Sequence, residues 1–275
     1  MAFFSRALVL VRGGGDLGSG VVFRLRRAGF PVVVTERATP WLVRRTVAFG
    51  EAVYSDAITI EGVTGQIAES AVWALDHANR DIVPVLIDEA NVALGALRPV
   101  VVVDARMEKT NLDTSIKDAP LVVALGPGFS AGVDCHAVVE TNRGHNLGRV
   151  IWHGPAEADT GEPGVVGGQT HSRVLRAPVT GYVTPHARIG DSISVGQVIA
   201  AVDEQPIVAA FDGVLRGLIH ERVHVSAGMK VGDLDPRARR EHCFTISDKS
   251  LAIGGGVLEA VLSAPQVRPY LKSDS

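Results

Sequence analysis

Glycines near the start of the chain have a spacing that is typical of phosphate-binding turns. Gly13, Gly15 and Gly18 match the pattern G-x-G-x-x-G within the stretch VRGGGDLGSG. In dinucleotide-binding folds the first glycine allows a tight turn, the second lets the backbone approach a pyrophosphate, and the third lets a helix pack on a strand. Glu36 follows Gly18 by 18 residues. In dinucleotide-binding folds, a carboxylate at about this distance accepts hydrogen bonds from the ribose hydroxyls. These residues predict a site for NAD or another nucleotide.

Two features of this stretch leave its interpretation open. A glycine turn without a ligand, in which Glu36 only ends a strand, explains the same residues. Asp16 lies inside the turn, and its carboxylate repels phosphate unless it points away or caps the helix, so we count it with the site residues. Glu36 favours NAD over NADP, whereas Arg37 leaves room for a 2′-phosphate.

A second polar cluster lies in the stretch LGPGFSAGVDCHAVVETNRGH. Gly126 and Gly128 predict a second glycine turn after a strand, and its backbone N–H groups could bind an anion. Arg143 is assigned to the same binding site. Cys135 and His136 match no standard zinc spacing, and neighbours in an extended chain point to opposite faces. We therefore assign no metal ligand, and the catalytic residues stay unknown.

The elements that must position these residues alternate between strands and helices. Residues 7–11 form an apolar run before the glycines, a helical pattern follows them, and PVVVTE is a second buried strand. Further strands are predicted in VPVLID, PVVVVDAR, APLVVALGPG and GRVIWHG, and a helix in GQIAESAVWALDHAN. This pattern predicts an α/β, Rossmann-like domain with a mostly parallel sheet over residues 1–155.

An internal repeat marks a second region. Residues 156–173 are rich in glycine, proline and polar residues and are interpreted as a linker. The segments that begin at Ala177 and Ala209 align with an offset of 32 residues, with glycines and apolar residues at matching places. Residues 174–236 are therefore predicted to form a small all-β barrel-sandwich domain with two related halves.

The last region, residues 237–275, is predicted to contain a strand and a helix. The helix begins after Ser247 or Asp248, either of which is a good N-terminal cap. Its apolar face must be buried, so we expect it to pack back on one of the two domains.

Composition narrows the classes of function. The net charge of −3 gives no sign of a nucleic-acid partner, and no apolar run is long enough to span a membrane. The chain has 2 cysteines, far apart in the sequence, which fits the reducing cytoplasm better than a disulfide framework.

Several longer segments carry a resemblance to a known family. VRGGGDLGSGV, ALGPGFSAGVDCHAVVETNRGH and CFTISDKSLAIGGGVLEAVL resemble the accessory proteins of the selenium-dependent molybdenum hydroxylase system, over about residues 7–262. The resemblance implies a cytoplasmic maturation factor that binds a nucleotide or a molybdopterin-type cofactor. Its implied partners are a molybdenum hydroxylase apoprotein or cofactor-synthesis proteins, and a homo-oligomer is left open. A more distant likeness is to xanthine dehydrogenase accessory proteins.

The repeat region resembles the biotinyl/lipoyl domains, which also have two related halves. Those carriers need a lysine at the hairpin between the halves, and no lysine lies between Lys117 and Lys230. A swinging-arm role is thereby excluded, which leaves a scaffold, a lid or a docking surface.

Two other functions remain as alternatives to a maturation factor. An NAD(P)-dependent oxidoreductase fits the glycine turn and Glu36, although no proton-transfer partner is evident. The second alternative is a non-catalytic protein-interaction module, in which the glycine turn at Gly13–Gly18 binds no ligand. The sequence leaves open whether the protein is an enzyme.

Overall fold

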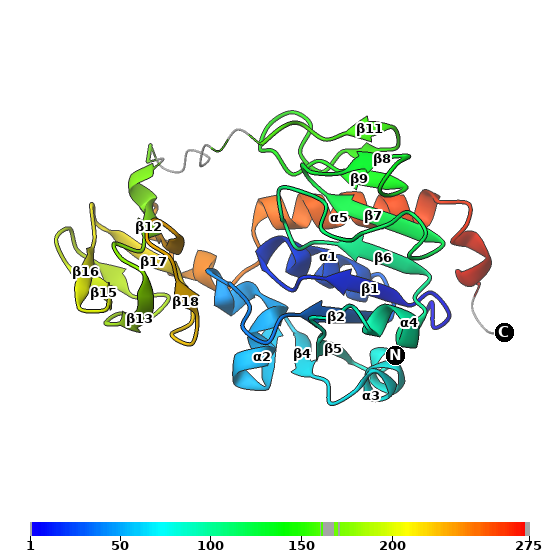
Figure 1. Ribbon diagram of the computed structural model, residues 1–275, viewed down its shortest axis with the longest axis horizontal. Helices are drawn as coiled ribbons and strands as arrows, with labels where there is room; N and C mark the ends of the chain where they lie inside the picture. The colour runs from blue at the N-terminus through cyan, green and yellow to red at the C-terminus, as the bar shows by residue number, and fades with distance from the viewer. Residues whose placement is uncertain (1, 160, 162–167, 170, 273–275) are drawn as a thin grey trace. The chain divides into compact units, whose positions relative to one another are not determined.

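The chain forms two compact units in a computed structural model that describes residues 2–159, 161, 168–169 and 171–272 (Figure 1). Unit 1 comprises Met1–Ala38, Phe49–Asp159 and Ile246–Ser275, and unit 2 comprises Thr39–Ala48 and Thr160–Thr245. Residues 237–275 are predicted to pack back on one of the domains, and the predicted first domain over residues 1–155 includes residues 39–48. In the structure these ten residues belong to unit 2, and both units are discontinuous in sequence.

Unit 1 is built on one large sheet. Its strands are β1 (Val9–Arg12), β2 (Val32–Glu36), β3 (Ala57–Ile60), β4 (Val63–Ile67), β5 (Ile82–Ile87), β6 (Val101–Asp104), β7 (Leu121–Leu125), β9 (Ala137–Val139) and β10 (Val150–Ile151). The strand order is β10-β9-β7-β6-β1-β2-β5-β4-β3, and only the edge strands β10 and β3 pair antiparallel. A small antiparallel pair, β8 (Ser130–Ala131) with β11 (Gly154–Pro155), lies beside it. The predicted α/β class with a mostly parallel sheet is confirmed.

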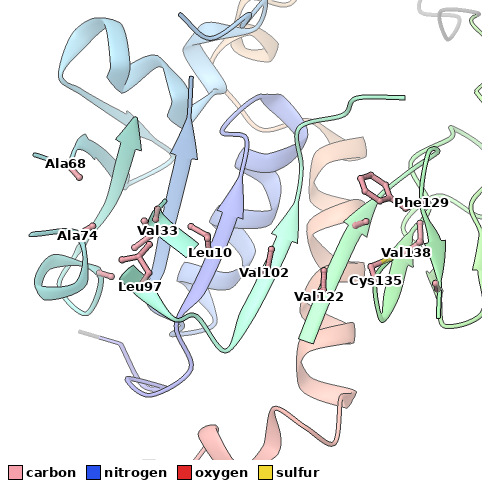
Figure 2. Close-up of a cluster of buried hydrophobic side chains, with 14 of the residues drawn as sticks. Leu10, Val33, Ala68, Ala74, Leu97, Val102, Val122, Phe129, Cys135 and Val138 are labelled. Carbon is pink, nitrogen blue, oxygen red and sulfur yellow. The ribbon is translucent and has the colours of Figure 1, made fainter. Parts of the chain in front are cut away.

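Helices cover both faces of this sheet. On one face, α3 (Ala71–Ala78) and α4 (Ala93–Leu97) bury Ala74, Ala78 and Leu97 against a cluster that includes Leu10, Val102 and Val138 (Figure 2). Side chains alternate between the two faces along a strand. Val139 therefore lies on the opposite face, where it packs against Gly256 of α5 (Asp248–Ser263). The helix α1 (Asp16–Arg27) contacts α5 along its length and lies beside it in Figure 1.

The contact between α1 and α5 depends on glycine. A Cβ atom at Gly254 would lie 2.7 Å from the carbonyl carbon of Gly20, and a Cβ at Gly20 would lie 2.6 Å from that of Ser250. The two helix backbones therefore touch where side chains would normally separate them. Gly255, between its two buried neighbours, has nothing within 4 Å of the position of its Cβ.

Unit 2 contains two four-stranded antiparallel sheets. Its strands are β12 (Val174–Arg176), β13 (Gly181–Pro185), β14 (Ser192–Ile193), β15 (Val198–Val202), β16 (Gln205–Val208), β17 (Gly213–Leu218), β18 (His224–Val225) and β19 (Lys230–Asp235). The sheet orders are β12-β19-β17-β14 and β16-β15-β13-β18. The two sheets have equivalent strand orders. The strands β12, β19, β17 and β14 of the first sheet correspond in turn to β16, β15, β13 and β18 of the second, and each corresponding pair is four strands apart in the chain. The strands β14 and β18 also start 32 residues apart, as the repeat predicts.

Some local predictions differ from the structure. The antiparallel hairpin of β3 and β4 was not predicted, and part of β4 lies in the stretch interpreted as helix. That helix, α3, begins only after Ser70, whose side chain accepts a hydrogen bond from the Trp73 N–H. The C-terminal helix α5 begins as predicted, with Ser247 as its cap. In the described part of the chain, no helix is long and apolar enough to cross a membrane.

The α1–α5 contact predicts opposite effects at neighbouring glycines. Gly254→Ala should lower the free energy of unfolding by about 1–3 kcal/mol, because the new methyl group meets the backbone of α1. Gly255→Ala, the matched control, should raise it by about 0.5–1 kcal/mol, because alanine is the better helix former and open space surrounds the site. Urea unfolding measures both values, and equal effects of the two changes would contradict the close packing.

Candidate functional site

The candidate site lies at the carboxyl edge of the parallel sheet in unit 1. In the sheet, β2 and β5 lie on one side of β1, and β6, β7 and β9 lie on the other. Such a switch point leaves a crevice outside the carboxyl ends of the strands, where open α/β sheets bind their ligands. The first glycine turn leaves β1 at this point and contacts the segment that follows β6.

The first glycine turn is tight for steric reasons. Gly13 has a φ of 96°, and a Cβ there would lie 3.0 Å from the backbone of Ala105. A Cβ at Gly18 would collide with the carbonyl oxygen of Gly13. Gly15 differs, because its φ of −69° suits any residue, and it is the N-cap of α1. The turn therefore requires glycine at two of the three motif positions for its shape alone.

The Glu36 carboxylate lies against this turn. Its Oε1 accepts a hydrogen bond from the Gly14 N–H at 2.7 Å, and its Oε2 accepts one from the Arg37 N–H at 3.1 Å. Burial raises the pKa of Glu36, while these two hydrogen bonds act in the opposite direction. A carboxylate has about four acceptor positions, so both oxygens retain capacity for a hydroxyl donor.

Asp16 does not cap the helix that it begins. Gly15 occupies the N-cap, and the Asp16 Oδ1 accepts a hydrogen bond from the Ser250 hydroxyl of α5 at 2.8 Å. Capping of α1 by Asp16 would have directed this charge away from the phosphate position. The contact with Ser250 provides a different way, because it fixes one carboxylate oxygen toward α5.

The second glycine turn is held at the same edge. Gly126 and Gly128 have φ values of 70° and 98°, which favour glycine. The Gly126 N–H donates to the carbonyl of Val139 at 2.9 Å, and a Cβ at Gly126 would collide with the side chain of Thr141. The turn thus lies beside the segment that leaves β9, which carries Arg143.

Arg143 joins that segment to the start of α5. Its guanidinium donates two hydrogen bonds to Asp248, at 2.8 and 2.9 Å. The next residue, Lys249, lies near Arg143, Asp16 and Glu140, and its burial, together with the Arg143 charge, lowers its pKa. Sequence reasoning missed Lys249. Its only signal was a lysine in the first turn of a helix, where the helix dipole disfavours a cation.

Several other polar residues of the region have structural partners. The buried Glu140 carboxylate accepts hydrogen bonds from the backbone N–H groups of Asn142 and Glu157, at 2.7 and 2.8 Å. Arg106, which follows β6, pairs with the buried Asp104 at 2.6 Å. These groups shape the edge of the sheet rather than present free charges to a ligand.

Cys135 and His136 are integrated into the sheet. Cys135 is fully buried in the apolar cluster of Figure 2, and burial raises its pKa to about 12. The His136 Nδ1 accepts a hydrogen bond from the Val122 N–H at 3.0 Å, and burial lowers the pKa of His136. Within the described ranges, no group of three His, Cys, Asp or Glu side chains is placed to hold a metal ion.

The structure therefore places the predicted site residues along one edge of unit 1. Gly13, Gly15, Asp16, Gly18 and Glu36 form one continuous wall. Gly126 and Gly128 follow β7, and Arg143 follows β9, at the same edge. The hydrogen bonds of Arg143 to Asp248 and of Ser250 to Asp16 connect this group to the first through the start of α5. Ligand binding by these residues stays a prediction.

Comparison with known proteins adds one clear relative. The sequence matches no family model. It is 47% identical over 255 residues to "Uncharacterized protein YqeB" of Escherichia coli (strain K12). The match covers 93% of this chain and 47% of that protein, so the chain spans about half the length of this curated relative.

Solved structures give weak similarities. An aspartoacylase family protein from Mesorhizobium loti is 13% identical, with a TM-score of 0.28. The superposition covers 83% of this chain and 84% of that protein chain. A succinylglutamate desuccinylase/aspartoacylase from Rhodobacter sphaeroides is 14% identical, with a TM-score of 0.26 and the same coverage. Scores this low carry no argument about the activity of this protein.

These comparisons correct the expected family. The structural neighbours are named as aspartoacylases and a desuccinylase, the curated relative is uncharacterized, and none is a selenium or molybdenum hydroxylase protein. The assignment to the accessory family and the maturation function are therefore withdrawn. The hydroxylase and cofactor-synthesis partners, and the molybdopterin-type cofactor, had followed from that resemblance and are not carried further.

The environment of Cys135 predicts an inert thiol. With a pKa of about 12, its thiolate is scarce at about pH 8, so iodoacetamide should alkylate the folded protein at least about 1000-fold more slowly than the urea-unfolded chain. Peptide mass spectrometry measures the labelling of Cys135, with the equally buried Cys243 as internal control. Rapid labelling of Cys135 alone in the folded protein would instead indicate a reactive thiol.

Proposed function

We propose that unit 1 binds a nucleotide, with NAD(H) as the ligand class, at the turn formed by Gly13–Gly18. The observation that carries the proposal is the place of this turn. It leaves the central strand β1 at the switch point of a parallel sheet and leads directly into α1. The N–H groups in the first turn of a 12-residue helix, and the positive end of its dipole, favour a phosphate there.

The Glu36 carboxylate supports a dinucleotide with a free ribose hydroxyl. Glu36 ends β2, the strand next to β1, and its two hydrogen bonds to Gly14 and Arg37 fix both oxygens beside the turn. The remaining acceptor positions suit the two hydroxyls of a ribose. A 2′-phosphate would meet this carboxylate with like charge, which favours NAD over NADP.

Two finer expectations belong to this proposal. The strand orders of unit 2, which exchange under a shift of four strands, support a biotinyl/lipoyl-like barrel-sandwich. With no lysine between Lys117 and Lys230, such a domain would serve as a scaffold or docking surface. The free, buried cysteines Cys135 and Cys243 support a reducing, cytoplasmic location.

Calorimetric titration of the whole chain with NAD⁺, NADH, NADPH and ADP tests the proposal. Gly15→Asp should weaken NADH binding by about 10-fold or more, because it places a carboxylate at the phosphate position. The backbone at Gly15 accepts any residue, and aspartate is a good N-cap, so the variant should fold. Gly15→Asn is the matched control, since it caps the helix equally well without the charge.

The outcomes separate the possibilities. Tighter binding of NAD(H) than of NADPH, and a larger loss in Gly15→Asp than in Gly15→Asn, would support the proposal. Binding that is equal in the two variants would overturn the role of the turn. If none of the four nucleotides binds to the wild-type protein, the proposed function is wrong.

A further inference from the structure

Lys249 is a charged group at the carboxyl edge of the sheet to which the contacts among the described residues assign no structural role. It lies in the first turn of α5, and its side chain is half-buried. Its ammonium forms no hydrogen bond or ion pair with any residue that the structure describes. A half-buried charge without a partner is costly, and such positions are usually compensated by an opposite charge.

The carboxylates near Lys249 are already engaged elsewhere. Asp16 accepts from the Ser250 hydroxyl, Glu140 accepts from two backbone N–H groups, and Asp248 holds the Arg143 guanidinium. These four residues are the charged groups that face Lys249, from α1, from the end of β9 and its following loop, and from α5 itself. The ammonium is therefore surrounded by acids that bond to other groups.

The helix directs Lys249 toward the sheet edge. Lys249 lies one turn before Ile253 and two turns before Gly256, so the three share a stripe of α5. Ile253 is fully buried, and Gly256 packs against Val139 of β9, so this stripe faces the sheet. Side chains on a helix tilt toward its N-terminus. The lysine side chain is thus directed toward the carboxyl ends of the strands, where its charge interacts with Asp16 of α1 and Glu140 after β9.

We propose that Lys249 binds a phosphate group of the ligand, across from the first turn of α1. This inference rests on the proposed nucleotide site and adds a specific cation to it. The hydrogen bond between Asp16 and Ser250 sets the distance between the two helix starts. A phosphate placed there would meet the N–H groups of α1 on one side and the ammonium on the other.

Binding of ADP and of inorganic pyrophosphate tests the role of Lys249. Lys249→Met, which keeps the length and loses the charge, should weaken both by about 10- to 100-fold, as expected for a charge-assisted hydrogen bond. Lys249→Arg should restore most of the affinity, and Lys272→Met, at an exposed lysine, should leave it unchanged. Thermal unfolding of each variant confirms that it is folded.

The pH dependence gives a second readout. Burial, with the Arg143 charge, lowers the pKa of Lys249, so its ammonium loses its proton at a lower pH than an ordinary lysine. Affinity for ADP, whose phosphates stay ionised, should already fall in the wild-type protein as the pH rises from neutral toward about 10.4, the ordinary pKa of lysine. It should stay nearly constant in Lys249→Arg, because arginine keeps its charge over this range.

A third measurement does not depend on variants. An amine-acylating reagent should modify Lys249 in the free protein, and pyrophosphate should slow that modification without affecting Lys272. If the wild-type protein binds ADP and Gly15→Asp does not, but Lys249→Met binds normally and pyrophosphate gives no protection, this inference is wrong and the nucleotide site stands. If the wild-type protein binds none of the four nucleotides and no pyrophosphate, both are wrong.

Discussion

The close contact between α1 and α5 is the constraint on which the candidate site depends. The two helices come from the beginning and the end of the chain, and glycines at the crossing let their backbones touch. This approach brings Ser250 within hydrogen-bonding distance of Asp16. With larger residues at the crossing, the start of α5 would move away from the turn after β1. The shape of the site is therefore determined by residues one turn or more away from it.

At the carboxyl edge of the sheet, hydrogen bonds and ion pairs compensate the burial of several carboxylates. Burial of a carboxylate is costly unless hydrogen bonds compensate it. Glu36 and Glu140 each receive two backbone N–H donors, and Asp104 receives the Arg106 guanidinium. In the described part of this edge, the same accounting leaves the Lys249 ammonium without a hydrogen-bonded partner. The glycine motif indicates the candidate site, and the ammonium without a bonded partner is a second, independent indication at the same edge.

Local patterns in the sequence were sufficient for much of the fold. The apolar runs predict β1, β2, β5, β6 and β7, and the repeat predicts matching strands in unit 2, because each signal lies within one element or at a fixed offset. Contacts between distant segments were not predictable. The placement of residues 39–48 in unit 2, the hydrogen bond between Ser250 and Asp16, and the position of Lys249 all depend on which segments meet in the folded chain. The spacing of Gly13, Gly15 and Gly18 indicated the turn before α1, but it gave no sign that α5 packs against α1.

The interrupted course of the chain has a consequence for its synthesis. Unit 1 needs Ile246–Ser275, yet all of unit 2 is translated before that segment. Domains tend to fold as they emerge from the ribosome, so unit 2 can complete its sheets while α1 still lacks its neighbour. Until α5 is made, the glycine face of α1 and the surface around Val139 stay exposed to water. Unit 1 therefore cannot complete this part of its core before α5 is made, and truncation before α5 would remove both a core helix and one side of the candidate site.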